Sequence, residues 1–126
     1  MATIRVFELG DEFVFTHYFD GTDAFTDLSD YYDDESYRFE IPAREFESVR
    51  ETLKDHGHDF LLTDDPDDFC VVVERYEPHA VILRDSVVHW SRRDHEFFLM
   101  KDEAAVEKAI REGATPIEDT EFSSGL

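Results

Sequence analysis

The segment Asp55 to Asp59, with the sequence DHGHD, places His56 and His58 between two aspartates. Imidazole nitrogens and carboxylate oxygens at this spacing are ligands for zinc and other transition metals. A structural zinc site needs four ligands at recognisable spacing, and the other histidines of the chain complete no known metal motif. A histidine at a helix end also interacts well with the last carbonyl groups, and we favour that role for this segment.

A second group of chemically capable side chains lies at Asp85, His89, Arg92 and Arg93. On a helix these four residues share one face, and Asp85 would orient His89 as in a general acid/base pair. The same spacing also describes a solvated helix face with local ion pairs, which we favour. No serine or cysteine nucleophile with a glycine elbow accompanies the pair, because Cys70 lies inside the apolar run FCVVV and is expected to be buried.

Two arginines, Arg50 and Arg84, fall within the apolar arcs of predicted helices. A guanidinium that points toward a core needs an anionic partner, so the pair is a candidate site for a small anionic ligand near a helix–sheet junction. The favoured alternative is that each arginine pairs with a carboxylate, such as Glu40 or Glu74, or keeps its head in water.

Several elements have clear sequence signals. Phe46, Val49 and Leu53 recur at helical spacing after Pro42, and Gly57 is suited to the left-handed residue that ends a helix. The spacing therefore predicts a helix between Pro42 and Gly57.

The stretch from Tyr76 to Met100 is ambiguous, because it is readable as two paired strands or as a helix followed by a strand. Its first half lacks the alternation of a strand, and Asp85 with Ser86 is not a favoured hairpin turn. With Pro78 in the first turn, a helix gathers the apolar side chains on one side, so we favour a helix followed by the strand HEFFLMK.

These elements predict a single α+β domain spanning residues 1–126. From residue 37 to 100 the expected order is strand, helix, strand, strand, helix, strand, which is the ferredoxin-like or split βαβ pattern. The remaining parts are an N-terminal hairpin at 3–19, an acidic loop at 20–36, a C-terminal helix at 102–113 and a frayed tail at 117–126.

Charge is the most unusual property of the composition. The chain has 32 acidic and 12 basic residues among 126, a formal net charge of −20, and nine of the basic residues are arginines. A dense carboxylate surface keeps a protein hydrated in concentrated salt, where repulsion is screened, so the pattern indicates halophilic adaptation. The alternative is that the carboxylates imitate nucleic acid and inhibit a basic partner.

Composition also limits the function. Without a cluster of lysines and arginines, direct binding to nucleic acid is not expected. The single cysteine, the lack of a signal-peptide pattern and the lack of a long apolar segment predict a cytoplasmic protein that does not enter membranes.

The expected function is therefore non-catalytic and needs no cofactor. The chain would act through a protein partner, through self-association as a dimer across an open sheet face, or by binding a small ligand. The alternatives are a histidine/carboxylate or metal-dependent enzyme and the acidic inhibitor.

The halophilic interpretation predicts a salt requirement for folding. We expect far- and near-UV circular dichroism to show native signal only at molar KCl, because screening removes the repulsion between carboxylates. A complete fold in dilute buffer would contradict this interpretation and would favour a functional acidic surface.

Overall fold

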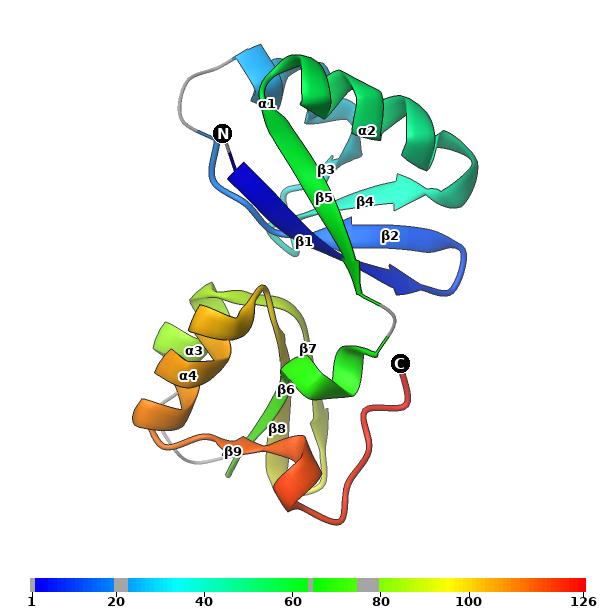
Figure 1. Cartoon of the computed structure of the whole chain (residues 1–126). Coiled ribbons are helices and arrows are strands. Elements are labelled where there is room, and N and C mark those ends of the chain that lie inside the picture. Colours follow the sequence, from blue (N-terminus) through cyan, green and yellow to red (C-terminus); the bar gives the residue numbers. More distant parts are fainter. Residues whose placement is uncertain (1, 20–22, 64, 75–79) are drawn as a thin grey trace. The chain divides into compact units, whose positions relative to one another are not determined.

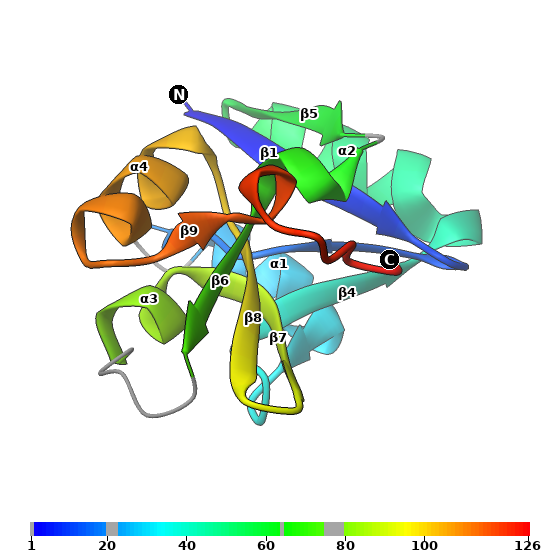
Figure 2. The same cartoon turned by 90° about the horizontal axis from the view of Figure 1, so that it is seen from below.

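The computed structural model describes residues 2–19, 23–63, 65–74 and 80–126. The chain divides into two compact units, Met1–Asp64 (unit 1) and Asp65–Leu126 (unit 2). The fold is mixed α and β, and each unit contains one sheet of its own with α-helices on one face of it (Figures 1 and 2). That the two units constitute a single domain stays a prediction.

Unit 1 is built on a five-stranded sheet with two α-helices. In chain order its elements are β1 (Ala2–Leu9), β2 (Glu12–Phe15), α1 (Asp23–Leu28), β3 (Tyr32–Asp33), β4 (Arg38–Pro42), α2 (Phe46–Asp55) and β5 (His58–Thr63), with 3-10 turns at Ser29–Tyr31 and Ala43–Glu45. The strand order is β3-β4-β2-β1-β5, and β5 runs parallel to β1 while the other neighbours are antiparallel.

Aromatic packing on the helix-facing side of this sheet forms the core of unit 1. Phe13 stacks on Phe46 of α2 with ring centres 4.0 Å apart, and Phe60 stacks on the same ring at 5.3 Å. Val49 and Leu53 of α2 are also buried. The predicted apolar stripe of this helix is therefore confirmed, and Gly57 has the expected positive φ of 83°.

Unit 2 has a four-stranded sheet with two helices. Its elements are β6 (Cys70–Glu74), α3 (Ala80–Arg84), β7 (Ser86–Arg92), β8 (His95–Met100), α4 (Glu103–Arg111) and β9 (Thr115–Pro116), with 3-10 turns at Pro66–Phe69 and Ile117–Asp119. The strand order is β7-β8-β6-β9, and all neighbouring strands are antiparallel. The buried side chains of α3 and α4 pack on Val71, Val73, Phe98 and Met100.

The hairpin predicted at 3–19 and the helix predicted at 102–113 are both present. β1 and β2 pair around Gly10, which has a positive φ of 65°. α4 begins after Asp102, whose side chain accepts a hydrogen bond of 2.8 Å from the Ala105 amide, as expected for a helix cap.

The helix favoured between Pro78 and Arg93 is wrong over most of its length. Pro78 lies outside the described residues, α3 ends at Arg84, and Ser86–Arg92 is strand β7. A β-bulge between Ser86 and Val88 inserts one extra residue and shifts the phase of the side chains, which hid the alternation. The two-residue turn of this hairpin lies at Arg93 and Asp94, where Arg93 has a φ of 56°.

A βαββαβ core at residues 37–100 is also wrong. β4 and β5 belong to the sheet of unit 1, whereas β6, β7 and β8 belong to the sheet of unit 2. Within a single sheet, the element order strand, helix, strand, strand, helix, strand occurs from Cys70 to Pro116. The predicted order begins one strand–helix pair too early, because it treats β5 and β6 as successive strands of one sheet.

The tail at 117–126 is not frayed as expected. Ile117 and Ser124 are buried, and the Phe122 ring lies 5.2 Å from the Phe97 ring in an edge-to-face arrangement. Ser124 donates a hydrogen bond from its hydroxyl to Asp67. The apolar sheet face beneath it therefore holds this segment.

Among the described residues, no helix combines the length and apolar character that crossing a membrane requires. Burial of Cys70, together with the nearby Asp67 and Asp65 carboxylates, raises the pKa of its thiol to about 12. The thiol is therefore protonated at neutral pH and is unsuited to act as a nucleophile.

Cys70 predicts a loss of stability at alkaline pH. The pKa of the Cys70 thiol in the folded chain is above the unfolded value of 9.0. The stability that the buried, protonated thiol contributes is therefore complete below pH 9 and is lost as the pH rises toward 12. At pH 10 we expect the free energy of unfolding of the wild type to fall by about 1 kcal/mol more than that of Cys70→Ala, relative to pH 7. Urea unfolding at both pH values measures this difference, and identical pH dependence in the two proteins would contradict it.

Candidate functional site

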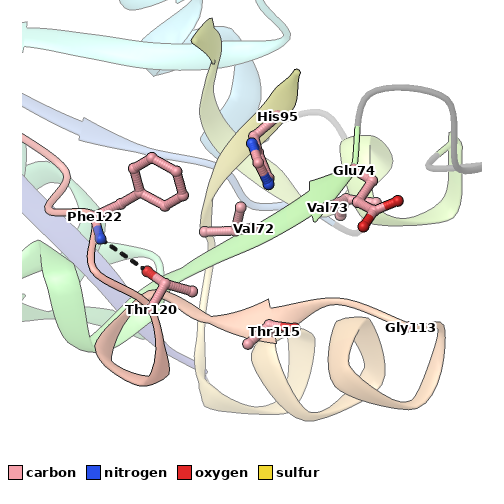
Figure 3. A pocket seen from close by; sticks show the side chains of 8 residues that line it. All are labelled: Val72, Val73, Glu74, His95, Gly113, Thr115, Thr120 and Phe122. Atoms are coloured by element: carbon pink, nitrogen blue, oxygen red, sulfur yellow. Dashed lines mark hydrogen bonds between the residues drawn. The ribbon is translucent and has the colours of Figure 1, made fainter. Parts of the chain in front are cut away.

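A pocket of about 240 Å³ lies in unit 2, on the side of the sheet that faces away from α3 and α4 (Figure 3). Its lining combines apolar, aromatic, hydroxyl, imidazole and carboxylate groups within a small space. The residues are Val72, Val73, Glu74, His95, Gly113, Thr115, Thr120 and Phe122.

Strand register places the two titratable side chains of this pocket opposite each other. Glu74 is the last residue of β6 and His95 is the first residue of β8, and the two are direct antiparallel partners. Directly opposite residues have Cβ atoms about 4.5–5.5 Å apart and side chains on the same face. A ligand in the pocket would therefore meet an imidazole and a carboxylate together.

The apolar part of the pocket comes from the C-terminal tail and from β6. The ring centre of Phe122 lies 5.1 Å from that of His95, and Figure 3 shows the His95 ring above Val72, between Phe122 and Glu74 in this view. Phe122 is held by its own amide, which donates a hydrogen bond of 3.1 Å to the Thr120 hydroxyl. The Thr120 hydroxyl in turn donates to the Ile117 carbonyl at 2.6 Å.

The pocket opens at the edge of the sheet because β9 is very short. β9 pairs with β6 only at Val71 and Val72, whereas β6 continues to Glu74. The chain that precedes β9 leaves α4 through Gly113, whose φ is 108°. No residue of β9 therefore lies beside Glu74, and this side of the strand faces the pocket.

The electrostatic surroundings of His95 are mixed. Arg92 of β7 is its other cross-strand neighbour, so Glu74, His95 and Arg92 form one row across three strands. The guanidinium carbon of Arg92 lies 5.3 Å from the centre of the Phe97 ring, a cation–π arrangement that holds it over the aromatic face. Among the described residues of the pocket lining, Glu74 is the only carboxylate, and none is a lysine or an arginine.

The two histidines of the DHGHD segment lie in different surroundings. His56 Nε2 lies 2.8 Å from Asp27 Oδ2 of α1, an ion pair when the imidazole is protonated. His58 begins β5, and its ring lies 5.9 Å from that of His17. In the described ranges, no cluster of three or more histidine, cysteine or carboxylate side chains could hold a metal ion.

Asp85 and His89 do not share a helix face. Asp85 lies between α3 and β7, and its carboxylate is 3.6 Å from Lys101 Nζ. His89 lies on β7, where it is exposed and its ring stacks 5.8 Å from Phe98. The helical spacing that suggested an acid/base pair therefore does not exist, because residues 86–92 form an extended strand.

The two arginines are found in different units. Arg50 Nε lies 3.5 Å from Asp59 Oδ1 in unit 1, a contact that is an ion pair without a hydrogen bond from that nitrogen. Arg84 is exposed at the end of α3 in unit 2. Neither arginine lines the pocket, and Glu40 pairs with Arg38 at 3.0 Å.

Comparison with known proteins identifies no relative: no family model, curated protein or solved structure matches the chain. The site must therefore be interpreted from its own chemistry.

Sequence reasoning missed the residues of this pocket for identifiable reasons. In the sequence, His95 is one of the histidines that complete no metal motif, and Glu74 is an expected partner for an arginine. Their common face follows from the register of β6 and β8, which the predicted placement of β5 and β6 in one sheet obscured. The alternation around FCVVVE and HEFFLM was the available signal, since Glu74 and His95 end one strand and begin the other.

The wall formed by Phe122 depends on the tether at Ser124. We expect Ser124→Ala to lower the free energy of unfolding of unit 2 by about 1–2 kcal/mol, because a buried hydrogen bond to the Asp67 carboxylate is lost. Amide hydrogen exchange at Phe122 should become faster in this variant. The matched control is Ser123→Ala, which alters an exposed neighbour and should leave both quantities unchanged. Equal behaviour of the two variants would contradict the tether.

Proposed function

We propose that the chain is a non-catalytic protein that binds a small ligand in the pocket of unit 2. The observation that carries the proposal is the facing pair of Glu74 and His95 in an open pocket with an aromatic wall. Small-molecule sites are typically concave and largely apolar, with a few polar groups that fix the orientation of the ligand. This pocket has that composition at a size suited to a small metabolite.

The chemistry of the lining favours a ligand with a cationic or hydrogen-bond-donating head and an apolar body. The Glu74 carboxylate accepts hydrogen bonds, and no side-chain hydrogen bond to it occurs within the described residues. Phe122 and Val72 offer an apolar surface, and an ammonium group beside an aromatic ring gains a cation–π contribution. We therefore propose a cationic ligand for this pocket, whereas the candidate site at Arg50 and Arg84 called for an anionic one.

A binding role is favoured over catalysis by the chemistry of the available groups. The Cys70 thiol is protonated and buried, so it supplies no nucleophile. Glu74 and His95 are the pair that a histidine/carboxylate enzyme would use, in place of Asp85 and His89. Turnover of an amine-bearing substrate that requires both side chains would favour that alternative.

The architecture of unit 2 is compatible with binding. We infer that Cys70–Pro116 is a ferredoxin-like, split βαβ unit, since its element order and antiparallel sheet have that form. This superfold hosts many unrelated functions, so the inference adds no argument about the ligand.

We also propose which partners the chain has and in what surroundings it acts. A protein partner or a second copy of the chain is supported by β5, an edge strand with Leu61 and Leu62 nearly half exposed. The acidic surplus supports a salt-rich cytoplasm and, as the alternative, an acidic inhibitor of a nucleic-acid-binding protein.

Benzylamine and benzoate are probes that separate the two signs of ligand charge. We expect benzylamine to shift the amide signals of His95, Thr115 and Phe122 in an NMR titration, with a dissociation constant on the order of millimolar. Benzoate, which has a similar size and shape, should not saturate these shifts because its carboxylate is repelled by Glu74.

A variant of Glu74 and a matched control complete this test. Glu74→Gln should weaken benzylamine binding by about fivefold or more, because the charge is lost while the shape is kept. Glu107→Gln, on the exposed side of α4, removes an equal charge and should have no effect. Tighter binding of benzoate than of benzylamine, or no effect of Glu74→Gln, would reject the proposed ligand class.

A further inference from the structure

A pair of imidazoles in unit 1 forms a second chemically capable site. His17 follows β2 by two residues, and His58 is the first residue of β5. β2 runs antiparallel to β1 and β5 runs parallel to it, so the end of β2 and the beginning of β5 lie at the same end of the sheet. The topology of the sheet therefore brings together two histidines that are 41 positions apart in the sequence.

The two rings lie against a buried phenylalanine. Their centres are 5.9 Å apart and their planes are inclined by 63°. The ring of Phe19 lies 4.8 Å from His17 and 5.5 Å from His58, and Phe19 itself is buried. An imidazole nitrogen binds a metal ion through its lone pair, which is present when the ring is neutral.

One nitrogen of this pair has no partner in the described parts of the chain. His58 Nδ1 is shielded from solvent and forms no hydrogen bond there. A buried polar atom without a partner costs about 1–3 kcal/mol, so an external donor or a cation at this nitrogen would be stabilising.

We propose that His17 and His58 bind a divalent transition-metal ion of the zinc, nickel or copper type. Two imidazoles that each place a nitrogen about 2.1 Å from one ion have ring centres roughly 5–6.5 Å apart, which includes the observed separation. Imidazole nitrogen selects these ions over magnesium and calcium, which prefer oxygen. The protein supplies two ligands, and water completes the coordination.

The charge of unit 1 supports a cation at this position. Residues 1–64 contain 17 acidic and five basic side chains, so the local concentration of cations around unit 1 is raised. The site differs from the weaker candidate at DHGHD, because His56 pairs with Asp27 and the ring beside His58 is that of His17. It is also independent of the pocket in unit 2, and its failure would leave the ligand proposal untouched.

Nickel is the probe that tests the proposal, with about 10 mM magnesium present to occupy surface carboxylates. Isothermal titration calorimetry of the full chain should give a stoichiometry of one bound Ni²⁺ per chain. His17→Phe and His58→Phe, which keep a ring in place, should each weaken binding at least about tenfold. His89→Phe replaces an exposed histidine of unit 2 and should bind Ni²⁺ as the wild type does.

A measurement on the wild type alone covers the case in which a variant does not fold. Paramagnetic Ni²⁺ at low stoichiometry should broaden the ring NMR signals of His17 and His58 before those of any other histidine. The proposal is overturned if another histidine broadens first, if no binding is detected, or if both folded variants bind Ni²⁺ with unchanged affinity.

Discussion

The contact between Phe122 and Phe97 is the interaction on which the candidate site depends. An antiparallel sheet with helices on one face leaves its other face to be covered. In unit 2 the C-terminal tail lies over part of that face, with ring centres 5.2 Å apart, while the Ser124–Asp67 hydrogen bond fixes its end. The same ring that covers the sheet forms the wall of the pocket, so stability and binding share one side chain.

Local signals in the sequence were sufficient for elements that depend on near neighbours. The helix at Phe46–Asp55 has its predicted stripe and ends before Gly57, and the helix expected from residue 102 begins directly after its cap, Asp102. These features need only helical periodicity and residues that prefer helix ends. They are therefore independent of which strands later pair.

Long-range pairing was the part that could not be predicted. The bulge between Ser86 and Val88 lets β7 pair with β8 but interrupts the alternation of inward and outward side chains. The sequence of β7 therefore lacks the two-residue period typical of a strand. The assignment of β5 to one sheet and of β6 to another likewise depends on distant partners. Each β5 residue pairs with a β1 residue 56 positions earlier, as Phe60 does with Ile4. The Glu74–His95 and His17–His58 pairs both arise from such pairings, which explains why neither was found as a motif.

The order in which the chain is made has a consequence for unit 2. Each unit is a continuous half of the sequence, so unit 1 leaves the ribosome before unit 2 begins to emerge. Within unit 2, the hydrogen bond between Asp67 and Ser124 cannot form until Ser124, 57 residues later in the chain, has been synthesised. The pocket thus combines β6 and β8 with the last segment of the unit, and a nascent chain acquires it only when synthesis of unit 2 is complete.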